Sequence, residues 1–427
     1  MHHFRYDNAG VLCAEGVPLP VIARAVGTPV YVYAAATLRR HYRVFQDALQ
    51  GLDSLIAYSL KANPNLSVLR LLADLGAGAD VVSGGELDRA RRVGIPPDRI
   101  VFSGVGKTES EIGEAVAADI LQFNVESVAE LTVINRVACQ AGRKAPIAFR
   151  VNPDVAAGGH AKIATGHRST KFGVPIARAR ELYAKARAMP GIAVTGIDVH
   201  IGSQILEVVP FRSAFRAVAE LAAGLRADGH DIRIIDVGGG IGIPYGEQPG
   251  LALETYADVV RTTLGTGTRL VFEPGRLIVG NAGVLLASVL YMKEDSERRF
   301  VVLDAAMNDL LRPTLYGARH HPIVVHQSDK QADQRTCDLV GPVCESGDIF
   351  VEDALLPPLA AGDLVAFGTA GAYGAVMASE YNSRPLVPEV MVSGDRFGVI
   401  RRRPTREESL ALEEPFIVGA EAVDCSP

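Results

Sequence analysis

Short apolar runs alternate with amphipathic segments over most of the chain. Between about residues 38 and 280, runs rich in β-branched residues adjoin segments whose apolar positions recur at helical spacing, such as Glu86–Val93 and Phe211–Arg226. This alternation is typical of parallel β/α units. We therefore expect eight strands, at Leu55–Tyr58, Ala79–Val82, Ile100–Phe102, Ile120–Phe123, Ile147–Val151, Gly196–Ile201, Ile232–Val237 and Leu270–Phe272.

Eight such units predict an α/β protein with a closed (β/α)8 barrel over residues 34–281, although a doubly wound sheet shares the pattern. Beyond residue 282 the helical rhythm mostly stops, and short strand-like runs are separated by Pro and Gly. We expect these runs and the N-terminal pieces to form a second, all-β domain of residues 1–33 and 282–427. Its predicted strands are Val11–Leu12, Val30–Tyr33, Val284–Leu290, Arg299–Leu303, Ile323–His326, Asp338–Val340 and Leu364–Phe367.

Composition narrows the class of protein further. The 427 residues have a formal net charge of −6, which argues against a nucleic-acid partner. The N-terminus lacks the apolar run of a signal peptide, and Gly280, Asn281 and Gly283 interrupt the most hydrophobic stretch, so no membrane partner is expected. The five cysteines are scattered without metal-ligand spacing, and we expect no metal. These features indicate a soluble, cytoplasmic protein with a peripheral tail from Arg401 to Pro427.

Lys61 follows the first predicted strand, in Tyr58-Ser59-Leu60-Lys61-Ala62-Asn63. Apolar neighbours surround it, and Pro64 opens a helical pattern just after it. Desolvation there is expected to lower the pKa of the amine and make it a usable nucleophile. The alternative is a lysine whose stem is buried while its charge reaches solvent.

Polar and glycine residues occupy the ends of several other predicted strands, where barrel enzymes carry their sites. Gly238, Gly239 and Gly240 follow the seventh strand, and three successive N–H groups without side chains can converge on a phosphate, although a plain tight turn has the same composition. His200 ends the sixth strand, where a histidine with a purely structural hydrogen bond is the alternative. Glu273 ends the eighth, and a buried carboxylate requires a cation or a donor.

These motifs, in this order, resemble the pyridoxal-phosphate enzymes built like alanine racemase and the ornithine and diaminopimelate decarboxylases. The resemblance covers roughly residues 30 to 400. It implies that Lys61 holds pyridoxal 5'-phosphate covalently, that His200 packs on the cofactor ring, and that Glu273 meets the pyridine nitrogen. It also implies a phosphate site made of Ser203, Gly238, Gly239, Gly240, Gly275 and Arg276, with Tyr373 nearby. A carboxylate at the pyridine nitrogen favours decarboxylation, because family members that only racemise use a cation there.

Motifs in the second domain resemble the diaminopimelate decarboxylases in particular. Arg312 and Tyr316 lie in Arg-Pro-Thr-Leu-Tyr, and with Arg276 they are expected to bind the remote end of an amino-acid substrate. Arginine binds carboxylate through a two-pronged fork, so a second carboxylate on the substrate accounts for these residues, whereas the alternative for Arg312 is a surface charge. The implied reaction converts meso-2,6-diaminopimelate to L-lysine and carbon dioxide, the last step of lysine synthesis.

The motif Cys344-Glu345-Ser346-Gly347-Asp348 implies a homodimer with shared active sites. In the family, the cysteine is the proton donor, the glutamate holds the remote amine of the substrate, and both come from the other subunit; Tyr373 contacts substrate as well as cofactor. Two alternatives stay open: a decarboxylase of the same fold for another diamino acid, such as carboxynorspermidine, and a cofactor-binding protein without turnover. The latter has no need of Cys344, Arg312 and Tyr316.

Overall fold

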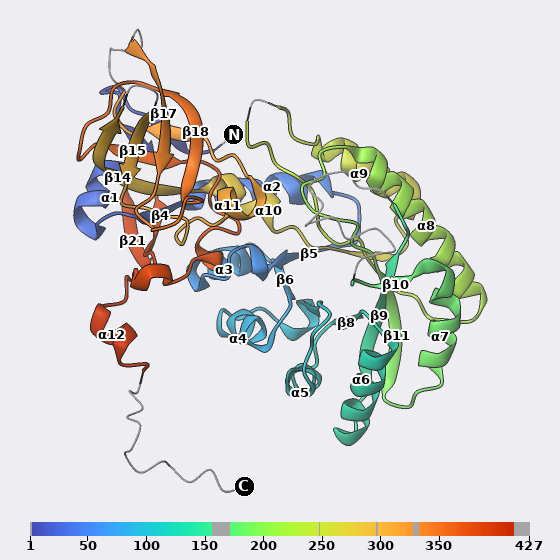
Figure 1. Cartoon of the computed structure of the whole chain (residues 1–427). Helices are drawn as coiled ribbons and strands as arrows, with labels where there is room; N and C mark the ends of the chain where they lie inside the picture. Colours follow the sequence, from blue (N-terminus) through green and yellow to red (C-terminus); the bar gives the residue numbers. More distant parts are fainter. Residues whose placement is uncertain (1, 156–170, 247, 296–297, 328–332, 414–427) are drawn as a thin grey trace, which may run out of the picture.

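The computed structural model describes residues 2–155, 171–246, 248–295, 298–327 and 333–413, which form two parts lying side by side (Figure 1). The first part is a barrel of eight parallel strands in the order β5-β6-β7-β8-β9-β11-β12-β13. β13 pairs with β5, with Leu270 opposite Ser54, so the sheet closes and a doubly wound sheet is excluded. The strands are β5 Ser54–Ser59, β6 Gly78–Val81, β7 Ile100–Phe102, β8 Gln122–Val125, β9 Ala145–Asn152, β11 Ile192–Asp198, β12 Ile234–Asp236 and β13 Arg269–Phe272.

The predicted barrel is confirmed, and two of its strands are displaced from their predicted positions. β8 begins two residues later than expected and includes the polar residues Gln122 and Asn124, which are fully buried and hydrogen-bond each other at 2.8 Å. β11 begins and ends earlier than expected, because Val199 and Ile201 are buried beyond the end of its ladder. The apolar residues after residue 198 are therefore buried without belonging to the strand, although their sequence resembles a strand.

Helices alternate with the barrel strands, and α3, α4, α5 and α6 begin with a side-chain cap. The α5 helix begins with a capping box in which Thr108 and Glu111 each accept a hydrogen bond from the backbone of the other. Among the described residues, no helix is long and apolar enough to cross a membrane. The helices of this part are α2 Ala35–Ala48, α3 Leu66–Asp74, α4 Gly84–Arg92, α5 Glu109–Ala118, α6 Val128–Gln140, α7 Ala179–Arg187, α8 Val208–Ala227, α9 Leu253–Leu264 and α10 Arg276–Val279. A short strand, β10 (Val174–Pro175), extends the sheet beside β9.

The second part is built on a mixed sheet in which both ends of the chain meet. β4, from the N-terminal segment, pairs antiparallel with β14 and parallel with β20, as expected for a domain assembled from both ends. All five residues of β4 are buried, and its alternate side chains enter two separate apolar cores. The strands of the sheet are β4 Val30–Ala34, β14 Gly283–Glu294, β15 Arg299–Leu303, β16 Pro322–Val324, β17 Arg335–Val340, β18 Ile349–Leu356, β19 Leu364–Phe367, β20 Glu389–Ser393 and β21 Arg396–Arg401.

Several elements outside the barrel differ from the prediction. The N-terminal segment contains a helix, α1 (Leu19–Val26), besides a three-stranded sheet of β1 (Phe4–Tyr6), β2 (Leu12–Ala14) and β3 (Val17–Pro18). Strands β18, β20 and β21 were not expected, and β21 is largely exposed, so its sequence shows little apolar alternation. Two short helices, α11 (Arg312–Tyr316) and α12 (Arg406–Leu410), complete the described chain. The tail beyond residue 413, including Cys425, lies outside the described residues.

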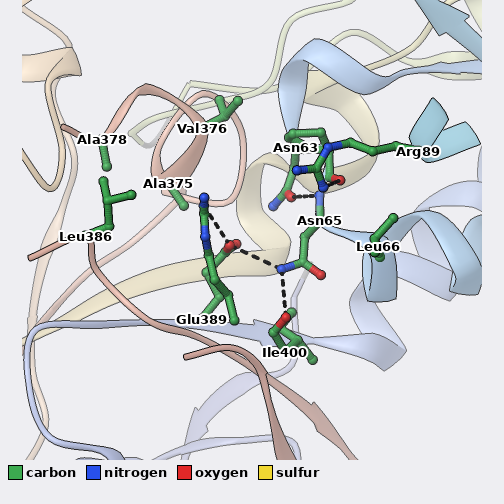
Figure 2. A pocket seen from close by; sticks show the side chains of 12 residues that line it. Asn63, Asn65, Leu66, Arg89, Ala375, Val376, Ala378, Leu386, Glu389 and Ile400 are labelled. Atoms are coloured by element: carbon green, nitrogen blue, oxygen red, sulfur yellow. Dashed lines mark hydrogen bonds and ion pairs between the residues drawn. The ribbon is translucent and has the colours of Figure 1, made fainter. Parts of the chain in front are cut away.

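A buried polar contact joins the two parts close to Lys61. Asn65, at the start of α3, donates to Glu389 Oε1 at 3.2 Å across a pocket between the two parts (Figure 2). Glu389 also accepts from Tyr33 at 2.7 Å and pairs with Arg401 at 3.3 Å. The same Asn65 caps α3 by accepting from Ser67 N. The side-chain amide of Asn65 therefore both caps α3 and bonds the barrel to the β domain.

We expect Asn65→Ala to destabilise the protein by about 2–3 kcal/mol. The change removes a helix cap, which is worth about 1 kcal/mol, and a hydrogen bond to a buried carboxylate. The matched control is Ser127→Ala, which removes only a cap, that of α6, and should cost about 1 kcal/mol. Urea unfolding followed by circular dichroism measures both, and equal losses in the two variants would contradict a role for Asn65 between the domains.

Candidate active site

A cavity of about 220 Å³ lies at the C-terminal ends of the barrel strands, where the β domain meets them. Two segments of the β domain, α11 and the loop at Tyr373, contribute to its wall. The loop is bonded to the barrel beside Lys61, because Tyr373 N donates to Ala62 O at 2.8 Å. The lining residues are Ser59, Lys61, Phe172, His200, Ser203, Gly240, Ile241, Glu273, Pro274, Gly275, Arg276, Arg312, Tyr316, Tyr373 and Met377.

Most of the residues predicted from the sequence are brought together around this cavity. Gly238 and Gly239 belong to the same turn as Gly240 but do not line it. Cys344 and Glu345 are exposed and lie outside it. Within one chain, the structure therefore places the predicted cofactor residues and arginines at one site and leaves the predicted proton donor elsewhere.

Lys61 lies two residues after the end of β5 and forms an ion pair. Its Nζ lies 2.7 Å from Asp80 Oδ2, and Asp80, at the end of β6, is completely buried. Ser59 donates to the same Asp80 oxygen at 2.5 Å, whereas Asp80 Oδ1 has no partner among the described residues. The carboxylate therefore holds the lysine amine at the strand ends, where the cavity is.

The expectation that burial would lower the pKa of Lys61 is wrong. Burial does act in that direction, but the negative charges of Asp80 and Glu273, together with Tyr373, outweigh it and raise the pKa above its ordinary value. The free amine is thus an ammonium at neutral pH. It must pass a proton on before it can act as a nucleophile.

The glycine turn after β12 is required mainly by close backbone packing. A Cβ on Gly239 would lie 2.1 Å from Glu273 O, and one on Gly240 would lie 2.2 Å from Gly202 O. Gly238 N donates to Asp236 Oδ1 at 3.0 Å, and Gly239 N donates to His200 Nδ1 at 3.1 Å. Of the three N–H groups expected to converge on an anion, only that of Gly240 has no acceptor among the described residues.

His200 is held as a neutral imidazole. Its Nδ1 accepts from Gly239 N, which leaves the proton of the neutral ring on Nε2. Burial, reinforced by the nearby charges of Arg150 and Lys61, moves the pKa of His200 well below its usual value. The ring therefore offers an uncharged flat face to the cavity.

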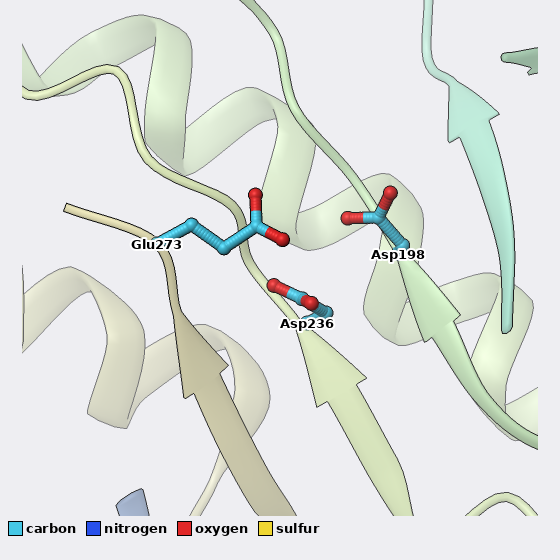
Figure 3. A group of neighbouring side chains, drawn as sticks. All are labelled: Asp198, Asp236 and Glu273. Carbon is cyan, nitrogen blue, oxygen red and sulfur yellow. The ribbon is translucent and has the colours of Figure 1, made fainter. Parts of the chain in front are cut away.

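Glu273 directly follows β13 and belongs to a buried polar network. Its Oε1 accepts from Ser103 Oγ and from Asn124 Nδ2, both at 3.2 Å, which supplies the donors that its burial requires. Asn124 also donates to Asp236 Oδ2 at 3.0 Å. Figure 3 shows the carboxylates of Asp198, Asp236 and Glu273 converging from neighbouring strands, with one oxygen of each within 4.8 Å of the others.

Burial, together with the charges of neighbouring carboxylates, raises the affinity of these three carboxyl groups for protons. Burial first, and then the charge of Asp80, raises the pKa of Glu273 to about 7, although Lys61 and Arg150 act in the opposite direction. Burial and the neighbouring carboxylates raise the pKa of Asp198 and Asp236 well above the usual value. Protons shared among them therefore relieve the charge that the barrel interior cannot solvate.

Two buried arginines, Arg276 on α10 and Arg312 on α11, lie on the cavity wall. They are 6% and 7% exposed, and no carboxylate among the described residues pairs with either. Their positive charges face aromatic rings instead, with Arg276 lying 4.9 Å from the Tyr373 ring and Arg312 lying 5.7 Å from the Tyr316 ring. Arg276 also donates to Ser203 Oγ at 3.3 Å, and its Nε has no partner among the described residues. A buried guanidinium without a carboxylate indicates a site for an anionic ligand.

Several residues of the site were not predicted. Tyr245 accepts a 2.6 Å hydrogen bond from Arg276, and His320 accepts one of 3.3 Å from Arg312. Tyr245 follows the glycine turn in a loop and His320 follows α11, so neither stands at the end of a barrel strand, where the sequence directed attention.

Comparisons with known proteins agree with this geometry. Residues 35–280, more than half of the chain, match the family model described as "Pyridoxal-dependent decarboxylase, pyridoxal binding domain". A barrel carrying a strand-end lysine, a neutral histidine and a buried carboxyl thus defines a pyridoxal-dependent decarboxylase domain.

Similar proteins narrow the class. Diaminopimelate decarboxylase of Zymomonas mobilis is 48% identical over 411 residues, 95% of this chain and 97% of that protein. The enzyme of Vibrio cholerae is 45% identical and covers 97% of this chain and 99% of its own length. The crystal structure of diaminopimelate decarboxylase from Helicobacter pylori complexed with L-lysine superposes with a TM-score of 0.89 at 44% identity, covering 92% of this chain and 98% of that one. The chain belongs to the diaminopimelate decarboxylase family.

The raised pKa of Glu273 predicts a pH-dependent effect of Glu273→Gln on the cofactor-free protein. The folded pKa of about 7 exceeds the unfolded value of about 4.3, so the carboxyl contributes stability that is complete below pH 4.3 and is lost as the pH rises through 7. Glutamine keeps the shape without this dependence. We expect the variant to gain on the order of 2 kcal/mol relative to wild type between pH 5 and pH 8.

Thermal melting of both proteins at the two pH values tests this prediction. The control is Glu181→Gln, an exposed residue whose pKa is lowered by hydrogen bonds from Lys185 and Arg178, and which should show no such gain. A Glu273→Gln variant whose stability relative to wild type is the same at pH 5 and pH 8 would contradict the raised pKa.

Proposed function

We propose that this protein decarboxylates meso-2,6-diaminopimelate to L-lysine and carbon dioxide with pyridoxal 5'-phosphate. The observation that carries the proposal is the pair of buried arginines without a described carboxylate, on the wall of a cavity that also holds the strand-end lysine. One anion is the cofactor phosphate, and the other is a carboxylate on the substrate, remote from the reacting carbon. The likeness to diaminopimelate decarboxylases over nearly the full chain supports the same substrate.

The residues around the cavity fit pyridoxal phosphate by the chemistry of their donors. Lys61 offers an amine for covalent attachment, and Glu273 offers a carboxyl for the pyridine nitrogen. Ser203, Arg276 and the free N–H of Gly240 offer donors to a phosphate. Gly275 is required by packing beside them, because a Cβ there would lie 2.9 Å from Ala62 Cβ. When bound, the cofactor supplies a ring that accepts the electron pair released by the departing carboxylate.

The chain's own residues bind, orient and control protons. The neutral ring of His200 packs without adding charge, and Glu273, held by Ser103 and Asn124, keeps a fixed direction. Asp80 holds the Lys61 ammonium and provides a nearby acceptor for its proton. Arg312 and Tyr316 place the remote end of the substrate, with Tyr373 beside them.

A test of the substrate follows from the arginines. Enzymes for ornithine or lysine need an acidic group for a distal ammonium, whereas this cavity presents guanidinium groups. We expect lysine formation from meso-diaminopimelate, and markedly lower rates with carboxynorspermidine, ornithine and lysine, in a coupled assay of carbon dioxide release. Preferential turnover of carboxynorspermidine would favour the alternative decarboxylase, and cofactor binding without turnover of any of them would favour a binding protein.

Lys61→Ala should abolish turnover, because the covalent link to the cofactor cannot form. Borohydride reduction of the loaded wild type, followed by peptide mass analysis, should find the cofactor on the peptide containing Lys61. Lys185→Ala, which removes an exposed lysine on α7, is the matched control and should keep both the adduct and the activity. A cofactor adduct on another lysine of the Lys61→Ala variant would contradict the assignment of Lys61 as the residue that binds the cofactor covalently.

We further propose a cytoplasmic homodimer whose active sites combine residues of both subunits. Cys344 and Glu345 lie in the connection between β17 and β18, exposed and outside the cavity of their own chain. That connection is ordered by internal bonds, since the buried Asp348 accepts from Met307 N and Val343 N. A well-built but exposed loop with a thiol and a carboxylate is suited to reach a neighbouring subunit, and a two-fold axis repeats the contact.

Mixing two defective variants tests the shared site. Lys61→Ala and Cys344→Ala should each be nearly inactive alone, but refolding them together should restore roughly a quarter of wild-type activity, because half of the randomly paired dimers contain one intact site. Mixing Lys61→Ala with itself is the control. No recovery, with subunit exchange shown by tagged chains, would place both residues at one site of one subunit.

A further inference from the structure

The side chain of Arg312 is hydrogen-bonded to a buried histidine, His320. His320 follows α11 and is 1% exposed. Its Nδ1 lies 3.0 Å from Gly368 O, and its Nε2 lies 3.3 Å from Arg312 Nε. The imidazole thus bridges the backbone after β19 and the guanidinium on the cavity wall.

These two contacts define the protonation of the ring. A carbonyl oxygen only accepts, so Nδ1 carries the proton, and Arg312 Nε only donates, so Nε2 is the bare acceptor. Burial lowers the pKa of His320 to about 4, and the charges of Arg312 and Arg276 oppose the backbone bond that would raise it. The ring is therefore neutral near pH 7, with its lone pair directed at Arg312.

The bond to His320 decides which edge of Arg312 remains for a ligand. A guanidinium binds carboxylate bidentately either through Nε and one terminal nitrogen or through its two terminal nitrogens. Nε is taken by His320, and no described residue accepts from the two terminal nitrogens. Only the pair of terminal nitrogens, called here the end-on fork, is left to bind a carboxylate.

The ring of Tyr245 lies close to both arginines and to His320. Its ring lies 5.5 Å from the Arg312 guanidinium and 5.9 Å from that of Arg276, and it meets the His320 ring edge-on at 5.4 Å. The electron-rich ring partly compensates the positive charge of both guanidinium groups.

We propose that His320 is a positioning residue that sets specificity for the remote carboxylate of the substrate, by reserving the end-on fork of Arg312 for it. The inference rests on the proposed function, because it concerns the same ligand. His320 does not itself line the cavity. It acts through Arg312.

Two substitutions separate this role from a purely structural one. His320→Asn can keep the donor to Gly368 O but loses the acceptor for Arg312, whereas His320→Gln can place its amide oxygen where Nε2 was. Calorimetry with the cofactor-loaded enzyme measures binding of L-lysine, which retains the remote carboxylate. The comparison ligand is 1,5-diaminopentane, which has no carboxylate.

We expect His320→Asn to weaken L-lysine binding roughly tenfold, as the loss of one charge-assisted contact does, while binding of 1,5-diaminopentane is unchanged. His320→Gln should keep most of the affinity for L-lysine. With meso-diaminopimelate, KM should rise more than kcat falls in His320→Asn. His321→Leu is the matched control, since this adjacent histidine is exposed and does not line the cavity.

A double-mutant cycle completes the test. Because His320 acts through Arg312, His320→Asn should cause no further loss of L-lysine affinity in an Arg312→Leu background. Equal weakening of both ligands in His320→Asn, wild-type affinity for L-lysine, or additive losses in the cycle would each overturn the proposal. Failure of the wild type to bind L-lysine and to turn over meso-diaminopimelate would instead reject the proposed function.

Discussion

The burial of two guanidinium groups without a described carboxylate to pair with them is the constraint on which the site depends. Arg276 comes from the barrel and Arg312 from the β domain, so the constraint exists only when the two parts are assembled. Aromatic faces and the neutral His320 partly replace the water that these groups have lost. The positive charge that remains must be compensated by a ligand in the cavity. Two guanidinium groups favour a ligand with more than one anionic group.

Carboxyl groups with raised pKa values are concentrated inside the barrel. Asp198, Asp236 and Glu273 converge there, and Asn124 donates to two of them. The negative charges of Asp80 and Glu273 act on Lys61 and raise its pKa despite burial. The site thus has carboxyl groups on the inside of the barrel and guanidinium groups on the cavity wall shared with the β domain.

The contact between the two parts lies next to the chemistry. Tyr373 N bonds to Ala62 O, one residue from Lys61, and Asn63 donates to Gly371 O at 3.2 Å. A few residues further along, Asn65 reaches Glu389. The segment that carries Lys61 is therefore positioned by the same contacts that dock the β domain on the barrel. This explains why residues of both the barrel and the β domain line the cavity.

The sequence by itself determined the barrel, the β domain made from both ends of the chain, and most of the cavity residues. Strand–helix alternation follows from local burial, and functional residues of barrels stand at strand ends, so Lys61, His200 and Glu273 could be found by position. Their detailed roles came from the resemblance to a family. The unexpected strand β21 is exposed and charged, and so left no apolar pattern to detect.

Only the tertiary structure decided the electrostatics and the supporting contacts. The pKa of Lys61 depends on Asp80 and Glu273, which lie on other strands, and its direction could not follow from burial alone. The N–H groups of Gly238 and Gly239 proved to be used by Asp236 and His200. Tyr245 and His320 lie in loops, where no periodicity marks them. Interactions of this kind depend on distances between segments remote in the chain, and those distances exist only once the barrel closes and the β domain docks on it.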